Sequence, residues 1–397
     1  MPWKENGVLE ERLRFIENWK SEEWSLAELC REFSVTRKTG YKWIERYEAE
    51  GWEGLKDHSR APHEHPNAVA EEMEERVIAA RGLHPHWGAR KIHALLKRDA
   101  AIPAAATSTI GGILKRQGLT VPCKRRPRAR PSEQPLAHAS EANRVWCADF
   151  KGWFRTGDGD RIDPLTISDA YSRYLLRCQV VRAVDYAHSK PIFEAAFREY
   201  GLPERIRTDN GAPFGSNGDS GLTGLSVWWI KLGIHPERIQ PGKPQQNGRH
   251  ERMHRTLKQA TASPPAGSRR AQQERFDRFR KEYNDERPHE ALGQTTPDSH
   301  YEPSPRPYPR RIETIEYSSD WQIRRVSAGG QMKWNNQVVF VSHALQGEPV
   351  GLEPVDQDCW RVWFGFYQIG VLDPAKGRIW RPEQWEQRQR RKAEREL

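Results

Sequence analysis

The sequence predicts a multidomain protein: all-α modules at the N-terminus, a central α/β domain, and a small all-β sheet or barrel at the C-terminus. Two Pro- and Arg-rich segments, 123–135 and 302–310, disfavour regular helix and central strand, so we expect extended, mobile linkers there. The hydrophobic period is helical before the first segment, mixed between the two, and strand-like after the second. The boundaries that we predict are 1–60 and 66–118 for two helical modules, 119–139 for a basic linker, 140–300 for the central domain, 301–310 for a Pro-rich linker, 311–380 for the β domain and 381–397 for a charged tail.

The composition of the 397-residue chain excludes a single small module and a globally disordered protein, because 36% of the residues are hydrophobic and 16 are Trp. No apolar run approaches the roughly 20 residues of a membrane span, so we expect a soluble, intracellular protein without a membrane partner. The net charge of +10 makes a polyanionic partner plausible without naming it. The five cysteines include no CxxC pair, which argues against a zinc clip of that type.

The first helical module contains the pattern of a helix-turn-helix. Ser25 and Glu28 form a capping-box signature, and Thr36 can cap a second helix that Gly51 ends. In this motif the second helix reads the major groove of DNA, although a plain helical hairpin would give the same pattern. The basic residues that this helix exposes are Arg37, Lys38 and Lys42.

The second helical module repeats the pattern more loosely, with helices expected over 71–81, 89–98 and 108–117. Arg90 and Lys91 give it a basic surface, which suits DNA and equally a solvated helix face. The linker that follows is basic without an acidic residue, so it could track along phosphates or be a merely solvated spacer. Its first basic residues are Lys124, Arg125 and Arg126.

The central region predicts an antiparallel meander followed by alternating helix and strand. This order indicates an RNase H-like mixed sheet rather than a doubly wound nucleotide-binding fold, and no GxGxxG or P-loop argues otherwise. The expected strands are 145–150, 162–167, 175–181 and 204–208, and the expected helices are 189–200, 225–232 and a long one from about 245.

Three acids fall where this fold would bring them together. Asp149 lies within an apolar strand, Asp209 directly follows another strand, and Glu251 lies on the long helix. A carboxylate in an apolar strand is costly unless it is paired or binds a metal. Hard cations such as Mg²⁺ prefer oxygen ligands and offset the repulsion among several acids, and two ions about 4 Å apart can support phosphoryl transfer. Mn²⁺ is the natural substitute.

The long helix is predicted to carry Glu251 on a solvated face with other polar residues, because their spacings are three and four. Met253, Leu257 and Ala260 are expected to pack inward on the opposite face. The residues assigned to the face of Glu251 are Asn247, His254, Arg255 and Lys258.

The motifs WCADFKG, SDAYSRYLL, RTDNGAPF, NGRHERMHRTLK and YNDERPHEALGQTTP occur in this order, and together they resemble the integrase catalytic core of DDE transposases. The resemblance is to the bacterial insertion-sequence branch, the 481 type and its relatives, and it extends over most of the chain. It implies that Asp149, Asp209 and Glu251 bind the metal, with Asn210 and Gly211 shaping the turn at Asp209. Asn247 would begin the helix of Glu251, and Lys258 and Arg255 would contact DNA.

This resemblance implies a transposase that binds the terminal inverted repeats of a mobile element and catalyses metal-dependent strand cleavage and transfer. It also implies double-stranded DNA as partner, a homodimer or higher oligomer, two Mg²⁺ ions per site, and a cytoplasmic, nucleoid-associated protein in bacteria. Asp169 matches a recurrent acidic position, for which a structural role is favoured. The 41 residues between Asp209 and Glu251 exceed the usual interval, and the excess falls in the Gly/Ser-rich loop 215–226. The alternatives are a catalytically inactive DNA-binding regulator and a nuclease of RNA–DNA hybrids.

Overall fold

The computed structural model describes residues 7–58, 69–98, 103–120, 138–216, 218, 220–240, 246, 248–356 and 359–396. The chain divides into two compact units, 1–69 and 70–397. The predicted linker residues Lys124, Arg125 and Arg126, and Asn247 at the start of the long helix, lie outside the described residues. In the part of the chain that is described, no helix has the length and apolar character that a membrane crossing requires.

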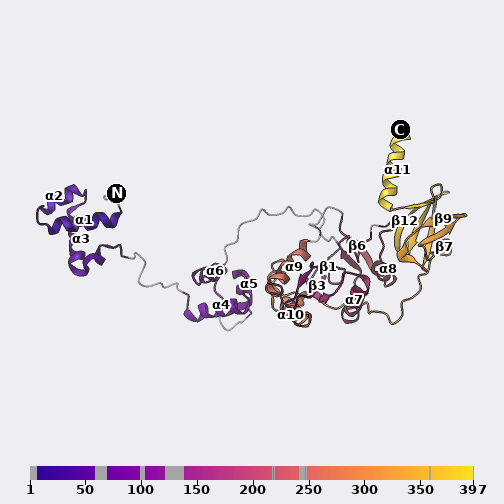
Figure 1. Cartoon of the computed structure of the whole chain (residues 1–397), viewed down its shortest axis with the longest axis horizontal. Helices are drawn as coiled ribbons and strands as arrows, with labels where there is room; N and C mark the ends of the chain where they lie inside the picture. Colours follow the sequence, from indigo (N-terminus) through magenta and orange to yellow (C-terminus); the bar gives the residue numbers. More distant parts are fainter. Residues whose placement is uncertain are drawn as a thin grey trace. The chain divides into compact units, whose positions relative to one another are not determined.

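The first unit is a three-helix domain that follows the predicted capping (Figure 1). The side chain of Ser25 accepts from the backbone N–H of Glu28 in a complete capping box, and that of Thr36 accepts from Thr39. Phe15, Ile16 and Trp43 are among the buried side chains of its core. Its helices are α1 (Val8–Lys20), α2 (Leu26–Glu32) and α3 (Arg37–Glu50), followed by a 3₁₀ turn, η1 (Gly51–Leu55).

The second unit begins with a further group of three short helices. Ile92, Ile110 and Ile113 are fully buried, so the group has an apolar centre of its own. The helices lie where the sequence predicts them, within a few residues. They are α4 (Glu71–Leu83), α5 (Ala89–Leu96) and α6 (Thr107–Arg116).

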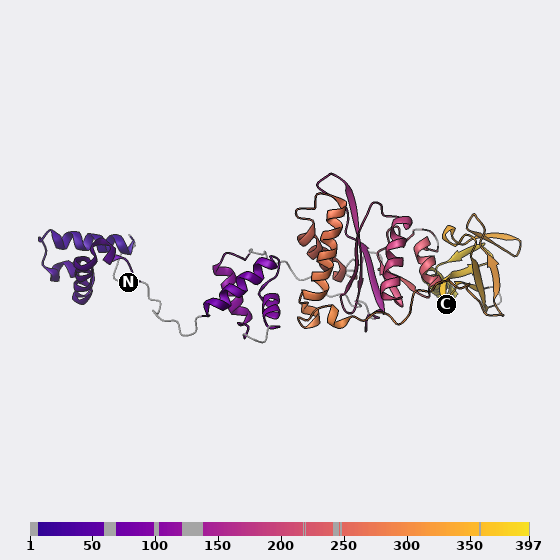
Figure 2. The ribbon, with the colours of Figure 1, turned by 90° about the horizontal axis from the view of Figure 1, so that it is seen from below.

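The central domain is a mixed sheet with helices on both faces, as the sequence predicts (Figure 2). Hydrogen bonds order the strands β3–β1–β5–β6, and β2 and β4 also pair with β3. β3 runs antiparallel to β1, whereas β1, β5 and β6 are parallel. The strands are β1 (Val145–Phe150), β2 (Phe154–Arg155), β3 (Arg161–Asp169), β4 (Leu175–Val181), β5 (Arg205–Thr208) and β6 (His235–Arg238), and the helices are α7 (Tyr186–Tyr200), α8 (Gly224–Lys231), α9 (Gly248–Thr261) and α10 (Arg269–Lys281).

The two faces of this sheet are separated by the alternation of side chains along each strand. Trp146 and Ala148 of β1 join the aromatic core under α7 and α8, together with Phe193, Phe197 and Trp229. On the other face, β4 packs against α9 and α10. The buried residues of that second core are Leu175, Cys178, Met253, Leu257, Phe276, Phe279 and Tyr283. Side chains two residues apart on a strand point to the same face, so Asp149 lies on the same side of β1 as Cys147 and points towards α9.

The segment 301–310 forms no regular helix or strand, as its prolines predict, but it packs along the central domain instead of crossing solvent as a mobile linker. Tyr301 and Tyr308 pack on the aromatic core. The backbone N–H of Leu202 donates to the carbonyl of Arg306 at 2.7 Å, and the Arg306 side chain donates to the carbonyl of Pro203 at 2.9 Å. These hydrogen bonds replace the solvation that a free linker would need.

The C-terminal region forms antiparallel sheets, as the strand-like runs predict. Its hydrophobic core includes Val227 and Ile230 of α8, so the region packs directly on the central domain. Lys231 and Glu348 add an ion pair at 2.7 Å across the same junction. The elements are β7 (Gln322–Arg325), β8 (Gln331–Trp334), β9 (Gln337–Phe340), β10 (Pro349–Asp356), β11 (Cys359–Phe364), β12 (Tyr367–Asp373), β13 (Arg378–Trp380) and α11 (Pro382–Glu396).

Candidate functional site

Asp149 lies near the end of β1 and faces the α9 side of the sheet. Its register partner on β3 is Thr166, so the two side chains lie next to each other on the same face. The Thr166 hydroxyl donates to the backbone carbonyl of Asp149 at 3.1 Å. The Asp149 side chain is only 18% exposed. A carboxylate with so little water around it is suited to binding a cation.

Asp209 follows the neighbouring parallel strand, β5. The parallel register of β1 and β5 pairs Cys147 with Arg207, and these residues come two positions before Asp149 and Asp209 respectively. The backbone N–H of Gly211 donates to Asp209 Oδ1 at 3.3 Å. Burial raises the pKa of Asp209, while this hydrogen bond opposes the increase.

The turn after Asp209 depends on its next two residues. The Asn210 side chain donates to the carbonyl of Ile239 at 2.9 Å, which ties the end of β5 to the chain after β6. A Cβ at Gly211 would lie 3.2 Å from Asp209 Oδ2, so a side chain there would crowd the carboxylate. This geometry fits the role that the resemblance implies for both residues.

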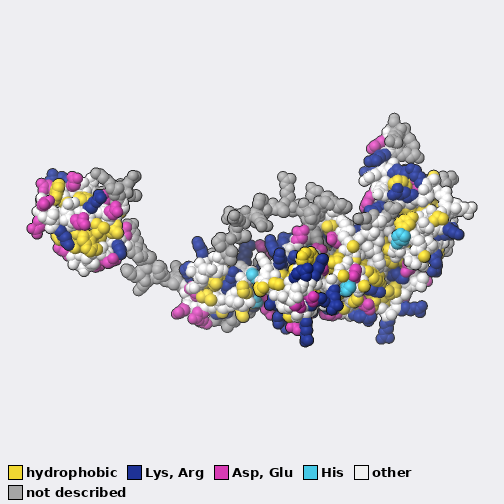
Figure 3. Space-filling view, in the orientation of Figure 1, with side chains coloured by type: hydrophobic (Ala, Val, Ile, Leu, Met, Phe, Trp, Pro, Cys, Tyr) yellow, Lys and Arg dark blue, Asp and Glu magenta, His cyan; other side chains and the backbone are white. Residues whose placement is uncertain are grey.

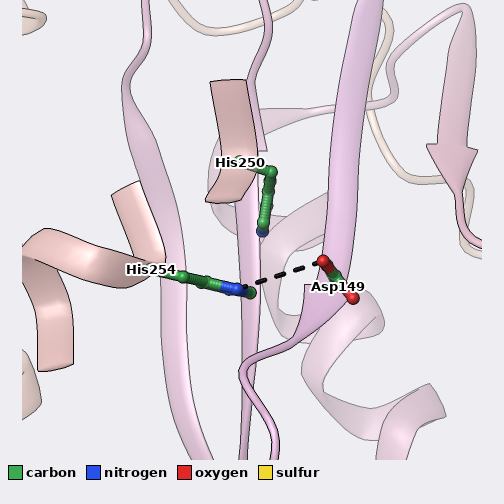
Figure 4. A group of neighbouring side chains, drawn as sticks. All are labelled: Asp149, His250 and His254. Carbon is green, nitrogen blue, oxygen red and sulfur yellow. Dashed lines mark ion pairs between the residues drawn. The ribbon is translucent and has the colours of Figure 1, made fainter. Parts of the chain in front are cut away.

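Helix α9 turns two histidines towards Asp149 (Figure 4). His250 is 3% exposed and His254 is 7% exposed. Their Nε2 atoms lie 2.6 and 2.7 Å from the Thr166 hydroxyl, and Nδ1 of His254 lies 3.9 Å from Asp149 Oδ2. Among the described residues, Asp149 and these two histidines form the group whose ligand atoms all lie within 4.8 Å of one another.

Both imidazoles are neutral at physiological pH. Burial lowers the pKa of His250 to about 3, and burial with the neighbouring His250 and Lys151 lowers the pKa of His254 to about 2. The contact between His254 and Asp149 is therefore not an ion pair between two charged groups. A neutral imidazole instead keeps a lone pair available for a metal or a hydrogen bond.

The predicted faces of α9 need two corrections. Glu251 is exposed as expected, but His254 is buried with Met253 and Leu257, and Ala260 is exposed. The sequence pattern assigned His254 to the solvated face, and it gave no role to His250. The signal was present, since the buried positions recur at spacings of three and four. These positions are His250, Met253, His254, Leu257 and Thr261.

The three predicted acids do not form a closed set of ligands in this structure. Their carboxylate oxygens do not all lie within 4.8 Å of one another. Asp149 lies in β1 and Asp209 directly follows the neighbouring strand β5, whereas the Glu251 side chain is exposed on α9.

The predicted DNA-contacting residues have different environments. Arg37, Lys38 and Lys42 are exposed on α3, and Arg255 and Lys258 are exposed on α9. Lys258 also lines a hollow of about 150 Å³, together with Lys151 and the exposed Trp153.

Arg90 and Lys91 contact the central domain, which differs from the free basic surface that the sequence suggests. Arg90 pairs with Glu290 at 2.7 Å, and Lys91 donates to the carbonyl of Pro288. Burial, together with nearby Arg287, lowers the pKa of Lys91 to about 8. In this arrangement the two side chains are engaged with protein groups.

Asp169 has a structural role, as the sequence favours. It is 1% exposed, and its carboxylate accepts from the backbone N–H of Asn143 at 2.9 Å. It also accepts from the backbone N–H and the hydroxyl of Ser172, at 2.8 and 2.7 Å. These bonds occupy the carboxylate in holding the end of β3.

Comparison with known families agrees with this fold. Two models described as "Integrase core domain" match residues 139–244 and 232–297. The central domain is an integrase core. A "Helix-turn-helix domain" model matches residues 11–63, and a "Homeodomain-like domain" model matches residues 39–114, upstream of the integrase core. The expected resemblance to an insertion-sequence transposase with an integrase core is confirmed, without its subtype.

Two relatives of the chain are encoded by insertion elements. One is the "Insertion element IS407 uncharacterized 31.7 kDa protein" of Burkholderia multivorans, 26% identical over 60% of this chain and 83% of the relative. Another is the "Insertion element IS476 uncharacterized 39.2 kDa protein" of Xanthomonas euvesicatoria, 26% identical over 58% of this chain and 65% of the relative, slightly less than two thirds of its length. Neither match confirms the 481 subtype.

Solved structures that match the chain include retroviral integrases. The simian T-cell lymphotropic virus intasome in complex with PP2A regulatory subunit B56 gamma matches with a TM-score of 0.36 and 17% identity, over 74% of this chain and 97% of that one. The HTLV-2 integrase catalytic core domain in complex with magnesium matches with a TM-score of 0.32 and 15% identity, over 41% of this chain and 99% of that one.

Proposed function

We propose that the chain is a transposase that binds the terminal inverted repeats of a mobile DNA element and cuts and joins DNA strands at a metal site. The observation that carries this proposal is the parallel register of β1 and β5 within an integrase core. This register pairs the residues two positions before Asp149 and Asp209, which supports placing the two acids near each other, because neighbouring strands lie about 4.8 Å apart. Glu251 is the third acid of the proposed set, on the helix that covers the same face.

The donor set fits a hard divalent cation, because half-buried carboxylates are the ligands that Mg²⁺ and Mn²⁺ prefer. Two such ions, when bound, would activate a water or a 3′-hydroxyl and stabilise the departing oxygen. In this proposal Asp149 and Asp209 hold the metal from fixed backbone positions. Glu251 completes the proposed set from α9, on which its side chain is exposed.

The proposed DNA contacts come from both units. On α3, the exposed Arg37, Lys38 and Lys42 support recognition of the repeats by the helix-turn-helix. On α9, Arg255 and Lys258 would contact phosphates beside the acids. Figure 3 shows Lys and Arg side chains on the surface of both the integrase core and the C-terminal region, where they could contact phosphates. We propose at least two copies of the chain on DNA, because two element ends must be joined.

The deciding experiment incubates the full chain with labelled duplexes carrying the element ends, with and without Mg²⁺. We expect metal-dependent nicking and strand transfer. Asp149→Asn, Asp209→Asn and Glu251→Gln should each reduce both to background while repeat binding persists. Glu194→Gln is the matched control, because Glu194 lies on α7, on the opposite face of the sheet, and pairs with Arg198.

Three outcomes would contradict the proposal. A protein that shifts the repeat duplex but never nicks it in Mg²⁺ or Mn²⁺ is a regulator rather than a transposase. Equal loss of DNA binding and cleavage in the Asp149→Asn variant would mean that Asp149 is structural. Preference for an RNA–DNA hybrid over duplex DNA would point to a hybrid nuclease.

A further inference from the structure

The Thr166 hydroxyl determines how the two buried histidines are protonated. It has one hydrogen and three partners: the Asp149 carbonyl at 3.1 Å and Nε2 of His250 and of His254 at 2.6 and 2.7 Å. For all three contacts to be hydrogen bonds, the hydroxyl hydrogen has to point to the Asp149 carbonyl, because a carbonyl can only accept. Both imidazoles must then donate from Nε2 to the Thr166 oxygen, which has two lone pairs. The hydrogen bonds therefore assign a lone pair to Nδ1 of each histidine.

The two Nδ1 lone pairs meet different partners. Nδ1 of His250 lies 3.4 Å from the Ser168 hydroxyl, which can donate to it. Nδ1 of His254 faces Asp149 Oδ2 at 3.9 Å, as Figure 4 shows. A separation of 3.9 Å is too long for a hydrogen bond between these two atoms. A cation between them would be attracted to both.

The spacing of these two atoms is close to that of two ligands of one ion. Ligands about 2.1 Å from a metal lie about 3.0 Å apart in octahedral geometry and about 3.4 Å apart in tetrahedral geometry. The observed separation of 3.9 Å needs a shift of less than about 1 Å. The hydrogen bond from His254 Nε2 to Thr166 fixes the ring orientation, as the outer partners of metal-binding histidines do.

We propose that His254 Nδ1 is a ligand of the divalent cation held by Asp149. This inference rests on the proposed function, and it adds one nitrogen to a site otherwise made of carboxylate oxygens. Mg²⁺ takes oxygen ligands, whereas imidazole suits first-row transition metals such as Mn²⁺ and Zn²⁺. The chain should therefore bind Mn²⁺ in preference to Mg²⁺. His250 is excluded from this role because both of its ring nitrogens already have hydroxyl partners.

The test is pulsed electron paramagnetic resonance of Mn²⁺ bound to the untagged full chain. A nitrogen ligand gives a direct ¹⁴N coupling, which we expect in the wild type and not in His254→Gln. The Gln amide can still reach Thr166 but places no nitrogen at the Nδ1 position. His250→Gln is the matched control, one helical turn away on the same threonine, and should retain the coupling.

Affinity gives a second readout from the same samples. The Mn²⁺ dissociation constant should rise at least about tenfold in His254→Gln, with a smaller change for Mg²⁺ in competition. If the His254→Gln variant does not fold, His254→Asn is used in its place, because the Asn amide oxygen can occupy the position of Nδ1. It should bind Mn²⁺ without the ¹⁴N coupling. Circular dichroism and thermal unfolding establish that each variant is folded.

Failure of this inference can be told apart from failure of the proposed function. If Asp149→Asn abolishes Mn²⁺ binding but the wild type has no ¹⁴N coupling, the metal site stands and His254 is not a ligand. Coupling that persists in His254→Gln overturns the assignment in the same way. If Asp149→Asn leaves Mn²⁺ binding unchanged, the metal site of the proposed function fails, and this inference fails with it.

Discussion

Acidification should destabilise the integrase core through its two buried histidines. An unfolded histidine has a pKa of 6.5, whereas burial lowers the pKa of His250 to about 3 and of His254 to about 2. Below pH 6.5 the unfolded chain therefore binds protons that the folded core excludes. The stabilising effect is complete above pH 6.5 and is lost as the pH falls from there towards 3.

The size of the effect follows from the same values. At pH 5.5 protonation favours each unfolded imidazole about tenfold, so the two together cost the folded state about 3 kcal/mol. This corresponds to about a hundredfold change in the equilibrium between the folded and the unfolded core. Both side chains are almost fully buried, so little solvent screening reduces the figure.

Hydrogen exchange measures this change where it occurs. Amides of β3, which includes Thr166, should lose about a hundredfold in protection between pH 7.5 and 5.5 after correction for the intrinsic exchange rate. His254→Gln should reduce the loss to about tenfold, because one imidazole remains. Equal protection at the two pH values, or an unchanged loss in His254→Gln, would refute the reasoning.

Three further predictions concern stability. Gly351→Ala places a Cβ 2.5 Å from Cδ1 of Tyr317, so chemical denaturation should show a loss of about 1–3 kcal/mol from overpacking. Asp169→Ala leaves the buried donors of Asn143 and Ser172 without their acceptor and should cost about 3 kcal/mol in the same assay. Arg306→Ala removes the donor to the Pro203 carbonyl, so limited proteolysis should cut the 301–310 segment faster than in the wild type; an unchanged rate would contradict its docking.

Features set by neighbouring residues could be predicted from the sequence. The strands Val145–Phe150 and Leu175–Val181 have the predicted bounds, because an apolar run between turn-forming residues needs no distant information. The capping box at Ser25 and the cap at Thr36 form as predicted for the same reason. The order of these elements also predicts the mixed sheet, since connection rules leave few topologies.

What the tertiary structure decided is which partner each surface meets. The burial of His254 depends on Thr166, which lies 88 residues earlier in the sequence. Helical spacing alone could not choose between solvent and sheet for a polar residue at the edge of an apolar stripe. The docking of 301–310 and the pairing of Arg90 with Glu290 likewise depend on groups distant in the chain. A hydrophobic pattern can be read from neighbouring residues. The partner of a hydrogen bond or ion pair, in contrast, is determined only when the fold brings distant groups together.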